Sequence, residues 1–166
     1  MRTNRLIALF AICGMLCTAK AQTREMMAGV QFGYVSSTYY NTNAQNAFEI
    51  GCRFHYELTH QLILAPKANM YLNTSDNPWW AADAALDVHY NFVAAIDFCI
   101  YPIVGICTSY WDGAQLFPSQ SNFGGNIGLG AQYNVSSNIS LNAEYKYQIY
   151  QKRDVVNFAF SIGYRF

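Results

Sequence analysis

Residues 48–58 alternate between apolar and polar side chains with a strict period of two. The apolar positions are Phe48, Ile50, Cys52, Phe54, Tyr56 and Leu58, and the positions between them are Glu49, Gly51, Arg53, His55 and Glu57. Because successive side chains of a β-strand point to opposite faces, this pattern predicts a strand with one apolar and one charged face. The segment has eleven residues, which matches the roughly 9–11 that a tilted strand needs to cross a bilayer.

The same alternation recurs along the chain and predicts eight strands in all. It is clear in 123–135, 139–149 and 156–166, and less regular in 28–34, 62–72, 80–90 and 98–110. The segment 98–110 is the most apolar, and its inward and outward faces are the hardest to assign. We assign to its inward face Cys99, Tyr101, Ile103, Gly105, Cys107 and Ser109.

The connections between these segments differ in length. The longest are 36–45 and 112–122, and 74–79 is of medium length; the others are shorter and cover 59–61, 91–95, 136–138 and 151–154. Long connections on one side and short ones on the other are typical of membrane barrels with both ends of the chain on the short-turn side. The connection 151–154 is an exception, because it is short but belongs to the long-loop side.

The composition favours a membrane barrel over a soluble one. In a soluble barrel the apolar face would point inward, but an eight-stranded interior has room for few large side chains. Only 12% of residues are charged, about half the share in a typical soluble domain.

Aromatic residues also fall near the predicted strand ends, as in the girdles at lipid–water interfaces. They are Tyr34, Trp79, Trp80, Tyr90, Phe92, Tyr110, Trp111, Tyr133, Tyr164 and Phe166. We therefore predict an all-β fold, an eight-stranded antiparallel up-and-down transmembrane β-barrel with a polar lumen.

Two prolines fall inside predicted strands of this closed barrel. Pro66 lies in 62–72 and Pro102 in 98–110. Proline has no N–H to donate to a neighbouring strand. We therefore expect a bulge or a strand boundary near each one.

The first 21 residues have the layout of a secretory signal peptide. Arg2 and Arg5 precede an apolar run over 6–19, and Ala19-Lys20-Ala21 supplies a small-x-small cleavage site. The run is shorter than the ~20 residues that span a bilayer as a helix, although an uncleaved anchor is the alternative. We expect residues 1–21 to be removed and residues 22–166 to form the barrel domain.

Charge argues against a nucleic-acid partner, and cysteine content argues against a disulfide framework. Residues 22–166 hold seven basic and ten acidic side chains without a basic patch, which argues against nucleic acid. Cys52, Cys99 and Cys107 are odd in number and irregular in spacing, so they do not form a disulfide framework and are interpreted as wall residues. No cofactor is expected.

The chain ends in Ile162-Gly163-Tyr164-Arg165-Phe166. With the strand count and the alternation, this ending resembles the small outer-membrane barrels of the OmpA/OmpX type, and especially the group described as an outer membrane protein beta-barrel domain. The resemblance implies export to the outer membrane of a Gram-negative cell and contact with its lipid. It also implies that Ile162, Tyr164 and Phe166 form the signal read by the barrel assembly machinery.

The predicted inward faces carry nearly balanced charges. They are Arg53, Lys67, Lys146 and Arg165 against Glu49, Glu57, Asp83, Asp87 and Glu144, with His55 and His89 among them. Charges in a narrow interior have to be paired. Because side chains just fill an eight-stranded interior, we expect an ion-paired plug. The alternative is a narrow porin-like pore for small solutes.

The histidines suggest two further roles. His55 and His89 could form a metal site or a proton-coupled gate, but no HxH or HxxxH spacing supports this, so ordinary hydrogen-bonded lumen histidines are favoured. A lipid A-modifying enzyme would need a serine and a histidine, oriented by a carboxylate, at the membrane interface. No serine is placed beside either histidine, and we predict that the protein is not an enzyme.

The two long connections are candidates for contact with an extracellular partner. Residues 36–45 and 112–122 are rich in Tyr, Ser, Asn and Gln and carry one charge, Asp112. Such a composition suits adaptable surface contacts. It also suits an ordinary hydrated loop, which is the favoured interpretation, and no partner can be named.

Overall fold

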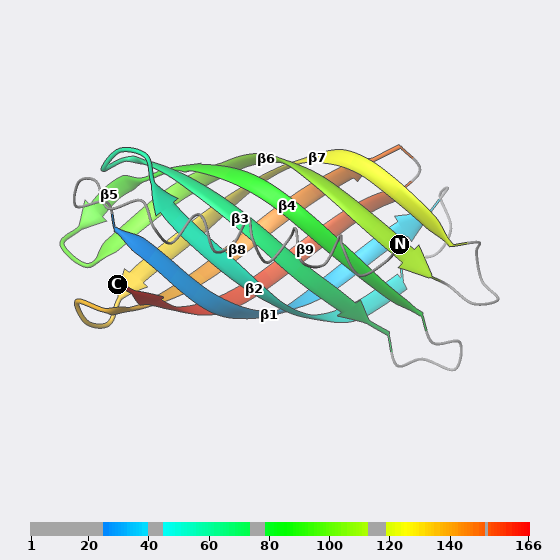
Figure 1. Cartoon of the computed structure of the whole chain (residues 1–166), viewed down its shortest axis with the longest axis horizontal. Coiled ribbons are helices and arrows are strands. Elements are labelled where there is room, and N and C mark those ends of the chain that lie inside the picture. Colours follow the sequence, from blue (N-terminus) through cyan, green and yellow to red (C-terminus); the bar gives the residue numbers. More distant parts are fainter. Residues whose placement is uncertain (1–24, 40–44, 74–78, 113–118, 152) are drawn as a thin grey trace, which may run out of the picture.

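Eight long antiparallel strands close into a barrel in the computed structural model, which describes residues 25–39, 45–73, 79–112, 119–151 and 153–166 (Figure 1). The strands are β1 (Met26–Tyr39), β2 (Gln45–Glu57), β3 (Leu62–Leu72), β4 (Trp80–Tyr90), the short β5 (Phe92–Ala95), β6 (Phe98–Asp112), β7 (Gln120–Asn134), β8 (Ile139–Tyr150) and β9 (Arg153–Arg165). Neighbours in sequence pair with each other, except that β4 and β5 both pair with β6, and β1 also pairs with β9. The predicted fold is confirmed, while the predicted signal peptide lies outside the described residues.

Across the described ranges, no helix has the length and apolarity needed to cross a membrane.

The strands are longer at the loop end than the sequence predicted. β1 continues to Tyr39 and β2 begins at Gln45, so part of the expected loop 36–45 is strand. In the same way β6 ends at Asp112 and β7 begins at Gln120, inside the expected loop 112–122. Backbone pairing continues beyond the apolar region because it does not depend on the polarity of the side chains. The remaining loop residues 40–44 and 113–118 lie outside the described part.

β4 and β5 form one strand that is interrupted opposite Pro102. The β4–β6 ladder ends at His89 with Ile103, and the β5–β6 ladder resumes in the same register at Phe92 with Ile100. Pro102 lies in this gap and cannot donate to β4, yet its pairing with β7 is continuous. The expected connection 91–95 is therefore wrong: the chain stays extended and turns at Ile96 and Asp97.

Pro66 is accommodated in the same way. The β2–β3 ladder pairs Arg53 with Lys67 and resumes at Tyr56 with Leu64, without a change of register. On its other side, Pro66 pairs with Leu86 in an uninterrupted ladder with β4. The expected strand boundary is found near Pro102, where the partner strand is divided into β4 and β5. The expectation is wrong at Pro66, which interrupts one ladder while both strands continue without a bulge.

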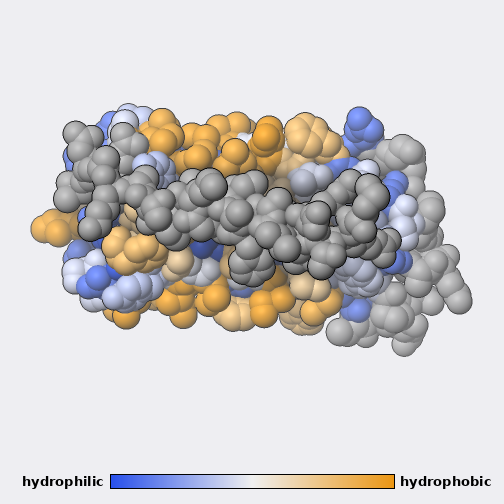
Figure 2. All heavy atoms as spheres, viewed as in Figure 1, coloured by the Kyte–Doolittle hydropathy of each residue, from blue (hydrophilic) through white to orange (hydrophobic). Residues whose placement is uncertain are grey.

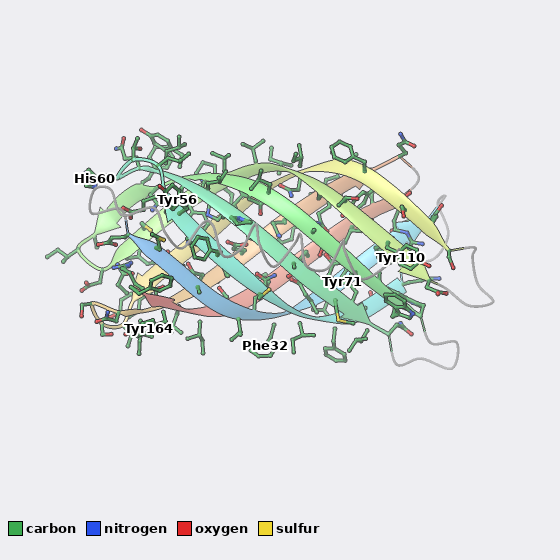
Figure 3. All side chains as sticks on the ribbon, viewed as in Figure 1. Phe32, Tyr56, His60, Tyr71, Tyr110 and Tyr164 are labelled. Atoms are coloured by element: carbon green, nitrogen blue, oxygen red, sulfur yellow. The ribbon has the colours of Figure 1, made fainter. Side chains whose placement is uncertain are left out.

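On the side of the barrel shown in Figure 2, the coloured residues are hydrophobic along the middle and mostly hydrophilic toward both ends. Phe32 and Tyr164 point outward in Figure 3 and are more than half exposed. In β6, Tyr101, Ile103, Cys107 and Ser109 are buried, whereas the intervening side chains are exposed. The inward phase assigned to this segment is confirmed.

Small residues make room for large side chains in the lumen. Tyr101 is almost fully buried, and its ring lies directly over Gly130 of β7, where a Cβ atom would collide with ring atoms and the hydroxyl. Close packing on this scale leaves no free space for added methyl groups.

A methyl group at Gly130 is expected to destabilise the barrel. Gly130→Ala should lower the free energy of unfolding by about 1–3 kcal/mol through overpacking. The control is Gly125→Ala on the same strand, because its Cβ atom would meet only the Gly105 carbonyl oxygen at 3.6 Å. Urea unfolding followed by tryptophan fluorescence measures both variants, and equal effects would contradict a tightly filled lumen.

Candidate functional site

Charged side chains from four strands meet in the middle of the lumen. Arg53 comes from β2, Lys67 from β3, Asp87 from β4, and Glu144 and Lys146 from β8. Each occupies an inward position of its alternating strand, and none is more than 4% exposed. Because water does not reach them, their charges have to be balanced by one another.

Glu144 is the centre of this cluster. Its Oε1 lies 2.6 Å from Arg53 Nη2, and its Oε2 lies 2.5 Å from Lys67 Nζ. The Tyr101 hydroxyl donates a third hydrogen bond to Oε1 at 2.9 Å. One carboxylate therefore joins β8 to β2, β3 and β6. None of these three strands is a neighbour of β8 in the sheet.

Asp87 extends the cluster toward Lys146. Lys67 Nζ lies 3.0 Å from Asp87 Oδ2, and Lys146 Nζ lies 3.8 Å from the same oxygen. Asn126 of β7 donates to Asp87 Oδ1 at 2.8 Å. The pairs thus form one connected network across the lumen.

Amides accompany the remaining predicted carboxylates. Glu49 accepts hydrogen bonds from Gln31 and Asn157. Asp83 accepts one from Gln148 at 3.3 Å. Both carboxylates are buried, and no ion pair within 4.0 Å is recorded for either among the described residues.

The two remaining predicted charges lie at the turn end of the barrel rather than in the central network. Arg165 Nε lies 3.0 Å from Glu25 Oε2, and Arg165 Nη2 donates to Asn134 at 3.1 Å. Glu57 is only partly buried beside them. These residues line a mouth cavity of about 190 Å³ that also reaches His55.

Sequence reasoning missed a cationic and aromatic cluster at the loop end. The Arg153 guanidinium carbon lies 3.9 Å from the centroid of the Trp111 ring, and Arg153 Nη1 donates to Ser37 at 2.9 Å. Trp111 packs on Trp79, with ring centroids 5.1 Å apart. Both tryptophans are buried, so their assignment to an outer aromatic girdle is wrong. The inward phase of Ser109 in the same strand is the signal that could have placed Trp111.

His55 and His89 are neighbours inside the lumen. Their ring centroids are 5.2 Å apart with the rings perpendicular. Arg53 Nε donates to His55 Nε2 at 3.1 Å, and His89 stacks on Tyr101 with centroids 4.7 Å apart. Among the described residues, neither ring nitrogen of His89 has a hydrogen-bond partner. One donor atom each of His55, His89 and Glu144 lie within 4.8 Å of one another, close enough to be considered as metal ligands.

The residues predicted as an assembly signal lie on the outside of the last strand. Ile162, Tyr164 and Phe166 are all more than half exposed. The Phe166 N–H donates to the Met26 carbonyl at 2.9 Å and so joins the end of the chain to β1. Recognition of these side chains by the assembly machinery stays a prediction.

The comparisons with known proteins agree with this architecture. A family model described as outer membrane protein beta-barrel domain matches residues 6–166. Among curated proteins, no sequence matches the chain.

Several solved structures share the fold. Neisserial surface protein A (NspA) aligns with a TM-score of 0.74 at 13% identity, over 85% of this chain and 97% of that one. Ail, the attachment invasion locus protein of Yersinia pestis, aligns with a TM-score of 0.66 at 14% identity, over 87% and 100%. The N-terminal β-barrel domain of Pseudomonas aeruginosa OprF aligns with a TM-score of 0.61 at 20% identity, over 83% and 97%. At these identities the likeness concerns the fold.

Neutralising the centre of the network is expected to destabilise the barrel strongly. Glu144→Gln keeps the side-chain shape but removes the charge that faces Arg53 and Lys67. Removing one partner of a buried ion pair costs about 3–5 kcal/mol.

The matched control for this variant is Glu25→Gln. Its ion pair with Arg165 lies at the barrel mouth with the Glu25 side chain 54% exposed, where such pairs contribute roughly 0–1 kcal/mol. Urea unfolding should separate the two variants clearly. A loss of stability in Glu144→Gln no larger than in Glu25→Gln would contradict the central role of Glu144.

Proposed function

The chain belongs to the family of outer membrane protein beta-barrel domains, and from this premise we propose that it is a non-enzymatic outer-membrane scaffold whose lumen is plugged by its own ion pairs. Membership of the family places the barrel in the outer membrane. The observation that carries the proposal is the position of Glu144, which pairs with Arg53 and Lys67 in the centre of the lumen.

The burial of the network favours a plug over a pore. The side chains of Lys67, Asp87, Glu144 and Lys146 are fully enclosed, and Tyr101 fills the space over Gly130. A solute could pass only if these pairs separated and left buried charges without partners, which is costly. Eight-stranded barrels in general have interiors that side chains just fill.

The surroundings of the histidines support a non-enzymatic role. Serine-based acyl transfer needs a hydroxyl within hydrogen-bond reach of a histidine. Here Arg53 donates to His55, and the Ser161 hydroxyl accepts a hydrogen bond from Arg53 at 2.8 Å. His89 stacks on Tyr101 inside the barrel, away from the outer surface where lipid would lie.

We further propose that the loop end presents a surface for an extracellular partner. The support is the polar, nearly uncharged composition of 36–45 and 112–122. Of these segments, 40–44 and 113–118 lie outside the described residues. Buried Trp79, Trp111 and Arg153 form a packed layer beneath this end of the lumen.

The plug makes a prediction for conductance. In planar bilayers the unmodified barrel should give no discrete current steps. The charge-balanced double variant Lys67→Ala/Glu144→Ala removes two side chains that meet in the centre, so it should open a path and produce steps. Heat-dependent gel mobility checks that both proteins are folded. Discrete steps in the unmodified barrel would instead support the pore alternative.

Export by a cleaved signal peptide is also part of the proposal. The support is the charged start, the short apolar run and the site at Ala19-Lys20-Ala21. Intact-mass measurement of protein extracted from outer membranes should find a chain that begins at Gln22. A mass that includes residues 1–21 would favour the uncleaved anchor.

A further inference from the structure

We propose that His55, His89 and Glu144 form a binding site for a divalent transition-metal ion of the zinc class inside the lumen. One donor atom from each side chain lies within 4.8 Å of the others, and all three residues are buried. They come from β2, β4 and β8, so an ion would link three strands. This site goes beyond the proposed scaffold and does not depend on whether the lumen conducts.

The chemistry of the three donors suits zinc. Two imidazole nitrogens and a carboxylate oxygen are common zinc ligands, and a water molecule often completes the tetrahedron. Bonds of about 2.0–2.1 Å place tetrahedral ligands about 3.4 Å apart. The three donor atoms would therefore have to approach one another by up to about 1.4 Å, which small side-chain rotations can supply.

His89 is the second observation that points to a ligand. Its side chain is fully buried, yet neither ring nitrogen has a hydrogen-bond partner among the described residues. A buried polar group without a partner lowers stability. The ring is held in place by stacking on Tyr101 and by its edge contact with His55. A ring nitrogen of His89 can therefore bind an ion beside His55 and Glu144 with little further loss of side-chain entropy. A metal ion supplies the partner that this nitrogen lacks.

Arg53 currently provides the positive charge between two of the ligands. Its guanidinium contacts His55 Nε2 and Glu144 Oε1 and so occupies an acceptor atom on two of the three ligand residues. Arg53 Nη1 also bonds to Ser161 on β9, which gives the displaced side chain another partner. The ion therefore competes with Arg53, and this competition limits the affinity of the site.

The mouth cavity provides a path to the site. It has a volume of about 190 Å³ and is lined by His55 together with Glu57, His60 and Arg165. His60 lies in the exposed turn after β2, at the end of the barrel where Figure 3 labels it. An ion can thus approach His55 from the turn end without passing the central network.

The test is metal titration of the purified full-length mature barrel in detergent. Zn²⁺ binding is measured by calorimetry, and Co²⁺ is used as a probe whose visible absorption reports nitrogen and oxygen ligands. We expect one ion per barrel. His89→Phe preserves the ring that stacks on Tyr101 but removes both nitrogens. Since even changes to residues behind a ligand cost 10–100-fold in affinity, it should weaken Zn²⁺ binding by about 100-fold or more.

Two matched variants separate this site from other binding. His60→Phe removes the exposed histidine at the mouth and should leave the affinity unchanged. Arg53→Met removes the competing charge and should tighten binding. Heat-dependent gel mobility confirms folding, and if Arg53→Met does not fold, the comparison of His89→Phe with His60→Phe decides alone. The proposal is overturned by absence of Zn²⁺ binding, by loss of binding in His60→Phe, by unchanged binding in His89→Phe, or by weaker binding in folded Arg53→Met.

Discussion

The hydrogen-bonded ladder between β1 and β9 is the constraint on which the rest of the structure depends. It runs from Met27 with Arg165 to Tyr39 with Arg153, and it removes the two free edges that an open sheet would expose to lipid. Closure with eight strands also fixes a narrow interior. Polar side chains on the inner face can then no longer reach bulk water, so they have to satisfy one another. The network around Glu144 and the close packing of Tyr101 on Gly130 follow from this closure.

The network does not have to increase stability in order to matter. Burying charges is costly, and well-packed apolar residues can often replace a buried ion pair without loss. What Glu144 adds is a relation between distant strands: its contacts with Arg53 and Lys67 tie β8 to β2 and β3 across the lumen. A slip of one residue would turn the inward side chains of a strand outward. In this barrel such a slip would also separate the ion pairs, so the charges oppose incorrect register.

Period-two alternation was sufficient to predict the strands and their faces, including the apolar segment 98–110. It could not predict where backbone pairing stops, because pairing continues through Ser36 and Ser37 and past Asn91, where side-chain polarity no longer alternates in a simple way. For the same reason Arg153 was assigned to a turn and Trp111 to the outer girdle. The proximity of His55 and His89 could not be predicted from the sequence either, since it depends on how β2 and β4 face each other across the lumen. That relation is set by closure of the whole sheet and not by local spacing.

The contact between Tyr101 and Gly130 has a consequence for how sequences of this kind can diverge. The two residues are directly paired on β6 and β7, and the ring of one occupies the space that a side chain on the other would need. The combined side-chain volume at positions 101 and 130 is therefore limited, so the two residues cannot change size independently. A lineage that gains a side chain at position 130 has to lose bulk at position 101, and with it the hydroxyl that holds Glu144. Substitutions at these two positions should accordingly appear together and be accompanied by changes in the ion pairs.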